Sequence, residues 1–211
     1  ITSDTAMTED VQKVFQQLTA MGKPGKLKKI LLAPFTLHKT MLELINREID
    51  FANQGKTARI IIKINALVEP ATIEALYRAS QAGVRVDLIV RGICCLRPGV
   101  KGVSDNIQVR SILGRFLEHT RLYYFHNDGD YHLYCASADW MDRNFFRRVE
   151  TCFPIEEPRL KRKVLKDGLL NYLADNTQSW TLQHDGSYRR SSPGNSKPRS
   201  AQARLLEQYT G

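Results

Sequence analysis

The chain has 211 residues, of which 42% are hydrophobic, and 31 basic against 22 acidic residues give it a net charge of +9. This length and composition exclude a disordered or fibrous chain and predict one globular domain with additional terminal sequence. No apolar run approaches the roughly 18 residues that a membrane-spanning helix needs. The positive charge favours a polyanionic partner, such as nucleic acid, a phosphate chain or an anionic membrane surface.

The cysteines show neither CxxC spacing nor a histidine at zinc-finger distance: they are Cys94, Cys95, Cys135 and Cys152. We therefore expect reduced thiols and no metal site made by the protein itself. Reduced thiols are typical of cytosolic proteins, so the predicted location is cytoplasmic. Association with an anionic membrane surface stays open because of the charge.

The first predicted element is a helix that Thr8 can cap and that Gly22 can end. Apolar residues recur on one face of it, at Val11, Val14, Phe15 and Leu18. The basic stretch over residues 22–29 contains Gly and Pro and is a candidate boundary.

Strands and helices then alternate up to residue 90. Apolar strands are predicted over residues 30–33, 58–64 and 84–90, with helices over residues 39–52 and from Pro70 to Gly83. This alternation is typical of a parallel sheet with right-handed crossovers. Short links follow, with strands over residues 107–112, 121–125 and 131–137 and a last helix over residues 159–174. The predicted fold is α/β: a mixed, largely parallel sheet flanked by helices.

Beyond residue 183 the pattern fades, and Gly, Ser, Pro and Arg dominate residues 185–204. We expect a flexible, basic tail there, with a short helix possible over residues 202–209.

Three polar segments follow predicted strands: residues 65–67, 91–99 and 137–144. Because ligands of open α/β sheets bind beyond the carboxyl ends of the strands, we expect these segments to meet there. His119 precedes its strand, so an antiparallel direction of that strand would bring it to the same edge.

His119 and Arg91 are the main candidate site residues. A neutral imidazole can pass a proton near pH 7, and an arginine fork can hold two phosphate oxygens. Arg91 follows an aliphatic strand, so it either binds phosphate or forms an internal salt bridge with Asp139 or Glu118. Gly92 would let the backbone approach a ligand closely.

Two further arginines, Arg147 and Arg148, read as the start of a strand, so at most one of them faces the pocket. The other four histidines are predicted to be structural. The sequence contains no GxxxxGK[ST] loop, no GxGxxG after a strand and no paired carboxylates typical of a magnesium cage.

Several segments together resemble the type-1 family of polyphosphate kinases. They include Asn65–Pro70, Arg91–Cys94, Leu96–Gly99, Asp105–Ile107, Gly114–Arg121 and Ser137–Asn144. The resemblance covers about residues 8–176, and Thr120 departs from it where a serine is expected.

That resemblance implies a phospholipase D-like fold, in which two similar α/β halves each give one histidine to the active site. His119 matches the assisting histidine, and Arg91 and Arg148 match arginines that contact phosphate. Arg121 takes the place of the lysine in the histidine-x-lysine pair of phospholipase D. The histidine that becomes phosphorylated has no match, which places it in a preceding domain. Residues 1–22 would close that domain, residues 23–176 would form the C-terminal domain, and residues 177–211 would be the tail.

The implied activity is reversible transfer of the ATP γ-phosphate to inorganic polyphosphate through a phosphohistidine, with Mg²⁺ arriving on the nucleotide. Implied partners are ATP or ADP, polyphosphate, the preceding domain and further copies of the full-length enzyme; no nucleic acid is expected. The isolated chain should be inactive without its nucleophile. Two alternatives remain: a phospholipase D-like phosphodiesterase that pairs two copies of His119 in a dimer, and a basic nucleic-acid-binding module.

Overall fold

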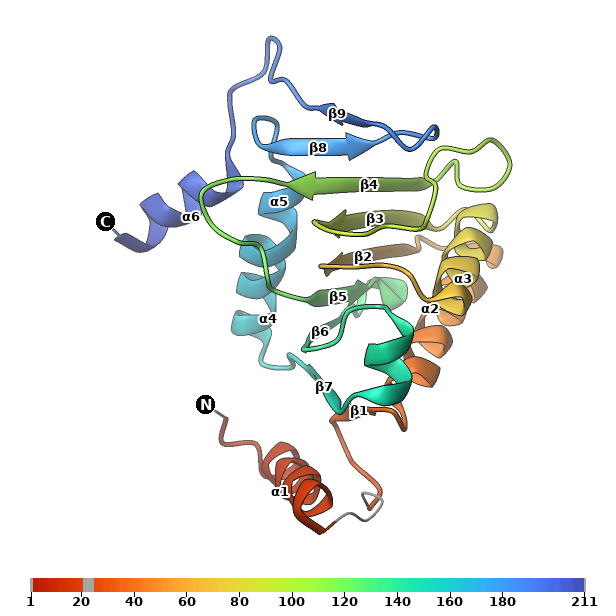
Figure 1. The fold of residues 1–211 in the computed structure, drawn as a ribbon, viewed down its shortest axis with the longest axis vertical. Helices are drawn as coiled ribbons and strands as arrows, with labels where there is room; N and C mark the ends of the chain where they lie inside the picture. The colour runs from red at the N-terminus through yellow and green to blue at the C-terminus, as the bar shows by residue number, and fades with distance from the viewer. Residues whose placement is uncertain (1, 21–24, 211) are drawn as a thin grey trace.

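A computed structural model describes residues 2–20 and 25–210, and within them nine strands form one sheet (Figure 1). The strand order is β1-β7-β6-β5-β2-β3-β4-β8-β9. The strands are β1 (Leu31–Ala33), β2 (Arg59–Ile64), β3 (Arg85–Val90), β4 (Ile107–Ile112), β5 (Leu122–Phe125), β6 (His132–Ala136), β7 (Glu150–Pro154), β8 (Ser179–Leu182) and β9 (Tyr188–Arg190).

Helices cover both faces of this sheet (Figure 1). They are α1 (Thr5–Ala20), α2 (Leu37–Asn53), α3 (Pro70–Gln81), α4 (Pro158–Leu165), α5 (Asn171–Leu173) and α6 (Ala201–Thr210), with a 3₁₀ turn η1 (Asn127–Gly129) and π-helical turns η2 (Arg143–Arg147) and η3 (Lys166–Leu170). None of these helices combines the length and the apolar character required to cross a bilayer.

The central strand β2 packs on both faces, which explains its nearly continuous apolar sequence. Ile60, Ile62 and Ile64 join the core under α2 and α3, whereas Ile61 joins a second core with residues of α5 and η3. Because side chains of a strand alternate between faces, one strand serves both cores. Lys63, a charged residue inside β2, is nevertheless buried.

The mixed α/β sheet flanked by helices is confirmed, but the expectation that it is largely parallel is wrong. Parallel pairing joins β2 to β3 and β3 to β4, and the remaining neighbours are antiparallel. The first strand, β1, pairs with β7 at the sheet edge instead of continuing the parallel series. Strands β5, β6 and β7 follow one another without an α-helix between them, and without a crossover helix consecutive strands pair antiparallel. Helices α4 and α5 lie between β7 and β8, and β8 pairs antiparallel with β4.

The flexible tail expected over residues 177–211 is also wrong, because β8 and β9 extend the sheet beyond β4. Ser179 and Leu182 of β8 are buried, and so is Ala201 at the start of α6. The helix expected over residues 202–209 is confirmed as α6.

Helix α1 begins at Thr5, where the Asp4 carboxylate accepts the Met7 N–H at 2.9 Å; Asp4, not Thr8, therefore caps it. The expected end at Gly22 lies outside the described residues. Further along α1, the buried Asp10 carboxylate accepts the backbone N–H groups of Lys28, Lys29 and Ile30. The domain boundaries placed at residues 22 and 176 stay predictions.

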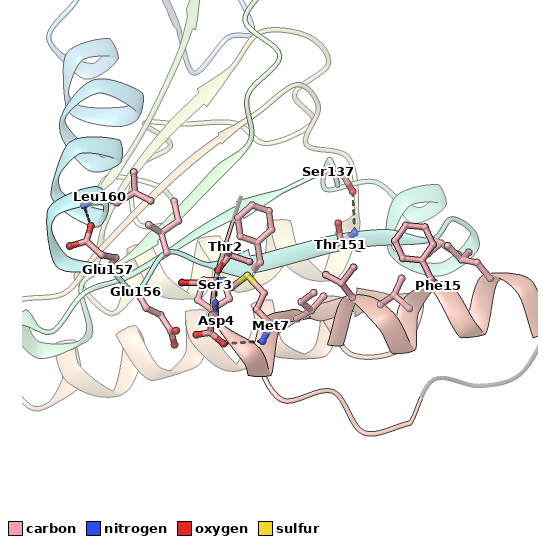
Figure 2. Close-up of a pocket in the computed structure, with 18 residues that line it drawn as sticks. Thr2, Ser3, Asp4, Met7, Phe15, Ser137, Thr151, Glu156, Glu157 and Leu160 are labelled. Atoms are coloured by element: carbon pink, nitrogen blue, oxygen red, sulfur yellow. Dashed lines mark hydrogen bonds between the residues drawn. The ribbon is translucent and has the colours of Figure 1, made fainter. Parts of the chain in front are cut away.

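The apolar face of α1 lies across an open groove of about 1070 Å³ from β7 and the start of α4 (Figure 2). Its apolar lining includes Val11, Phe15 and Leu18 of α1 and Phe153 of β7. The groove contains none of the predicted site residues.

A leucine substitution tests whether the former tail belongs to the core. Leu182 is 7% exposed and Leu206 of α6 is 40% exposed. We expect Leu182→Ala to lower the free energy of unfolding by about 2–3 kcal/mol, because it leaves a cavity in a packed core. Leu206→Ala should change it by less than about 0.5 kcal/mol. Urea denaturation measures both, and equally small effects would show that the segment is not packed.

Candidate functional site

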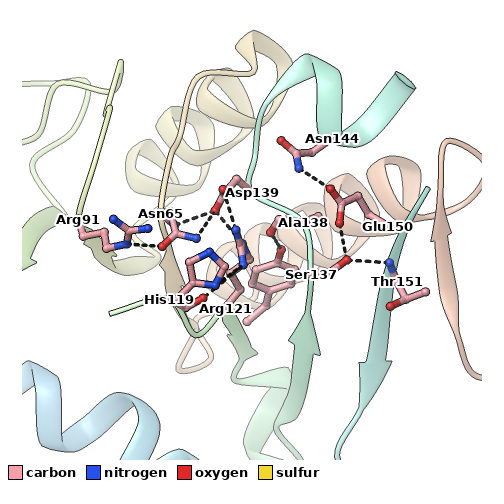
Figure 3. A network of polar contacts seen from close by, with 11 residues as sticks. Asn65, Arg91, His119, Arg121, Ser137, Ala138, Asp139, Asn144, Glu150 and Thr151 are labelled. Carbon is pink, nitrogen blue, oxygen red and sulfur yellow. Dashed lines mark hydrogen bonds and ion pairs between the residues drawn. The ribbon is translucent and has the colours of Figure 1, made fainter. Parts of the chain in front are cut away.

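The predicted polar segments meet at the edge of the sheet where β2 and β3 end, as their position after parallel strands indicated. Leu67, just after β2, forms bridges to both Cys94 and Trp140. Strand β5 runs antiparallel to β2 and places Leu122 opposite Lys63. The residues that precede β5, His119 and Arg121, therefore lie at the same edge (Figure 3).

The Asp139 carboxylate joins two of these segments (Figure 3). Its Oδ1 accepts the backbone N–H of Asn65 at 2.8 Å, the Asn65 Nδ2 at 3.1 Å and the Arg121 Nε at 2.9 Å. Its Oδ2 accepts the Arg121 Nη2 at 3.1 Å, which completes a two-point ion pair. Burial alone would raise the pKa of Asp139, but the hydrogen bond and charge of Arg121 and the Asn65 donors lower it below its usual value.

Arg91 is connected to the Asp139 network through the neutral side chain of Asn65. Its Nε donates to Asn65 Oδ1 at 2.5 Å, and the Asn65 amide is oriented because its nitrogen faces Asp139. The salt bridge considered for Arg91 with Asp139 or Glu118 does not form: Asp139 pairs with Arg121, and Glu118 pairs with Lys63 at 2.7 Å. Within residues 2–20 and 25–210, the Arg91 guanidinium has no carboxylate partner, so its charge can meet an anion.

The role expected of Gly92 is wrong. A Cβ at this position would lie 2.8 Å from the Asn65 backbone oxygen, which already accepts the Gly92 N–H at 2.8 Å. The glycine therefore permits close approach of two protein segments rather than of a ligand.

The His119 side chain is exposed at the mouth of this network. Arg121 Nη1 donates to the His119 carbonyl at 3.2 Å and lies 3.4 Å from the ring Nδ1. Because a guanidinium only donates hydrogen bonds, Nδ1 must be the acceptor in that contact. The neutral ring then carries its proton on Nε2, the atom directed away from Arg121.

Arg148 makes no contact with the Asp139 network. The strand expected from Arg147 onward is wrong, since Arg147 ends the π-helical turn η2 and β7 begins only at Glu150. The buried Glu150 accepts hydrogen bonds from Asn144 Nδ2, at 2.6 Å, and from the Ser137 hydroxyl (Figure 3). These bonds fix where the turn gives way to the strand. Arg148 is exposed and extended at that junction, and its phosphate role stays a prediction.

One buried pair was missed from the sequence. Lys63 Nζ is 2.7 Å from Glu118 Oε2 and 3.4 Å from the centre of the Tyr172 ring, and the Lys63 side chain is 3% exposed. Burial lowers the pKa of Lys63, partly offset by Glu118. The available signal was a lysine within the apolar run of residues 60–64, because a buried charge has to find a partner.

The described residues contain no group of three or more His, Cys, Asp or Glu side chains placed to hold a metal ion. The Asp139 carboxylate is committed to Arg121, and that of Glu118 to Lys63. The donor set of this edge therefore does not fit a resident magnesium ion.

An arginine without a carboxylate partner and an exposed imidazole lie together at the carboxyl edge of an α/β sheet. This arrangement is typical of a phosphate-binding site. The family model for "Polyphosphate kinase C-terminal domain 2" matches residues 30–202. The chain therefore belongs to the family of polyphosphate kinase C-terminal domains.

Curated relatives agree with this assignment. The chain is 60% identical over 208 residues to the polyphosphate kinase of Pseudomonas aeruginosa and 57% identical over 209 residues to that of Burkholderia multivorans. These alignments cover 98% and 99% of this chain. The chain spans about 30% of the length of either relative.

Among solved structures, the polyphosphate kinase of Porphyromonas gingivalis matches with a TM-score of 0.95 at 36% identity, over 100% of this chain and 32% of that one. A phospholipase D family member, Nuc of Salmonella typhimurium, aligns over 65% of this chain and 88% of its own with a TM-score of 0.47 and 15% identity.

The Asp139–Arg121 pair predicts a defined pH dependence of stability. Because folding lowers the pKa of Asp139, its contribution is complete above the unfolded value of about 3.9 and is lost as the pH falls through the folded value. Asp139→Asn should cost about 3–5 kcal/mol of unfolding free energy at pH 7, because it leaves Arg121 unpaired.

That deficit should shrink as the pH falls below about 3.9, because the unfolded Asp139 then binds a proton more readily than the folded one. Urea denaturation from pH 3 to pH 7 measures it, with the exposed Asp142→Asn as the matched control. A deficit that stays constant or grows as the pH falls would contradict the lowered pKa.

Proposed function

We propose that this chain is the C-terminal catalytic part of an ATP:polyphosphate phosphotransferase, which moves the ATP γ-phosphate reversibly onto inorganic polyphosphate. The observation that carries the proposal is the position of Arg91. Its guanidinium is held by Asn65 without a balancing carboxylate, and the same network holds His119. A cation and a proton donor at one edge suit a transferring phosphoryl group.

His119 acts as a hydrogen-bond donor in this proposal and not as the nucleophile. With Nδ1 facing Arg121, the neutral ring offers Nε2–H, which can donate a hydrogen bond to the leaving phosphate oxygen. A nucleophilic ring nitrogen needs a free lone pair, which Nε2 lacks in this tautomer. A donor aimed at an oxygen that gains charge in the transition state is typically worth about 10²–10³ in rate.

The arginines then divide into two roles. Arg91 neutralises charge on the phosphate oxygens as the γ-phosphorus–oxygen bond breaks. The charge of Arg121 is matched by Asp139, so Arg121 chiefly orients His119. Its Nη1, which lies beside the His119 ring, would add one contact to the phosphate. Arg148 is the second phosphate ligand in this proposal, reaching the phosphates from the exposed turn before β7.

The nucleophile is a histidine of another part of the enzyme, which becomes phosphorylated when the γ-phosphate leaves ADP and later passes that phosphate to the polyphosphate end. The greater length of the relatives provides room for such a domain. Mg²⁺ comes with the nucleotide, since this edge offers no donor set for it. We also propose that the full-length enzyme is a cytoplasmic homo-oligomer that binds no nucleic acid, with the membrane surface as a secondary location.

Two other functions make different predictions. A phosphodiesterase that pairs two copies of His119 requires a dimer that hydrolyses a model phosphodiester, and one of its rings must act as nucleophile. A nucleic-acid-binding module requires salt-sensitive DNA binding that survives His119→Ala. The Nε2–H tautomer disfavours the phosphodiesterase, whose ring must attack, and the family match over residues 30–202 favours phosphoryl transfer over DNA binding.

Binding of tripolyphosphate to the isolated chain tests the proposal by calorimetry. Arg91→Ala should weaken binding roughly 10–100-fold, because one charge-assisted contact is lost. Arg78→Ala, which removes the same charge from the exposed side of α3, should have little effect. The chain should not turn over ATP alone. Equal losses for both variants would refute the phosphate-binding role of Arg91. ATP-dependent polymer synthesis by this chain alone would refute the proposal that the nucleophile lies in another part of the enzyme.

A further inference from the structure

The loop that links β4 to β5, residues 113–121, carries His119 and is largely open to solvent. Leu113, Phe116 and Leu117 are 53%, 48% and 72% exposed. A loop of this length with so little apolar burial has few contacts of its own to order it. Its order must come from the segments that hold it.

One of these segments is the start of α6, at Gln202. The Gln202 Oε1 accepts the Phe116 N–H at 2.9 Å, while its Nε2 donates to the Phe116 carbonyl at 2.8 Å and to Glu118 Oε1 at 2.7 Å. Gln202 is 7% exposed, and its oxygen and both amide hydrogens are all used. The side chain therefore has one orientation that satisfies the loop.

Gly114 shows how closely Gln202 approaches the loop. A Cβ at Gly114 would lie within 2.8 Å of the Gln202 Cδ, and closer still to its Oε1. The glycine at the start of this loop is thus explained by the glutamine that packs against it, 88 positions later in the chain (202 − 114).

The Gln202 end of this contact is itself anchored. The Ala201 N–H donates to Asp175 Oδ2 at 2.7 Å, and Asn171 Nδ2 donates to the Ala201 carbonyl at 3.0 Å. The loop end is anchored through Glu118, whose second oxygen pairs with Lys63 of β2. Gln202 therefore connects two rigid parts of the domain through the loop.

We infer that Gln202 is a positioning residue: it clamps residues 116–118 to the core and so sets the place of His119, which follows directly. The inference rests on the proposed role of His119 in phosphate binding. His119 is then fixed on both sides, by Glu118 and Gln202 before it and by Arg121 after it. The C-terminal segment, which carries no phosphate ligand in the proposed function, acts on the site through this clamp.

The test uses the whole chain with Gln202→Met, which keeps the side-chain volume but removes the hydrogen bonds. Gln208→Met, on the exposed face of the same helix, is the matched control. Three measurements are made: backbone ¹⁵N relaxation of residues 114–120, the ring ¹⁵N signals of His119, and calorimetric binding of tripolyphosphate.

In Gln202→Met, we expect residues 115–119 to become mobile on the nanosecond timescale and the His119 ring signals to shift. Tripolyphosphate binding should weaken roughly 3–10-fold, the loss of one hydrogen bond from a displaced His119. Gln208→Met should leave all three unchanged. Gln202→Glu, which keeps the size and polarity but lacks the amide donors, should also loosen the loop, and it decides the matter if the first variant does not fold.

A folded Gln202 variant with unchanged loop relaxation and unchanged His119 signals would overturn the clamp. If the wild-type chain does not bind tripolyphosphate, the proposed function fails, but the relaxation and ring signals still test the clamp. The two failures are therefore distinguishable.

Discussion

The buried carboxylate of Asp139 is the interaction on which this site depends. It satisfies two donors of Asn65 and pairs with the Arg121 guanidinium, so it links the ends of β2 and β6 to the residues entering β5. Removing one partner of such a buried pair typically costs about 3–5 kcal/mol, which is a large part of the stability of a domain. The same bonds orient Asn65 toward Arg91 and Arg121 toward His119. Stability and site geometry therefore depend on one group.

This dependence also explains how charge is distributed at the edge. Two cationic side chains there are neutralised internally: Arg121 by Asp139, and Lys63 by Glu118. Arg91 meets only the neutral Asn65, and Arg148 stays exposed. The charge of Arg91 is thereby left for the phosphate that the proposed mechanism places there.

Much of this could be predicted from the sequence where the signal is local. The apolar stretches at residues 58–64 and 84–90 identify two central strands, and Pro70 marks the first position of α3. Ligands of open α/β sheets bind beyond the carboxyl ends of the strands, and this rule predicted that Asn65, Arg91 and His119 lie at one edge. The predictions that were wrong concern contacts between residues far apart in the sequence. Strand β8 has four residues, and only its pairing with β4 makes it part of the sheet. Likewise, nothing near Gln202 in the sequence indicates its contact with Glu118, which is 84 positions away.

The choice of ion-pair partners was equally beyond the sequence. Charge and spacing allowed Arg91 to pair with either Asp139 or Glu118, and only the direction of β5 decides that Arg121 takes Asp139. The same limit applies to Arg147 and Arg148, because the buried hydrogen bonds of Glu150 determine where η2 ends.

The most direct measurement of the central claim is the tautomer of the neutral His119 ring, read from long-range ¹H–¹⁵N correlations. The exposed His184 in the same spectrum is the internal reference. The account predicts a proton held on Nε2 and an Nδ1 signal typical of a hydrogen-bond acceptor, both lost in Asp139→Asn. A proton on Nδ1, or ring signals like those of His184 that ignore Asp139, would contradict it.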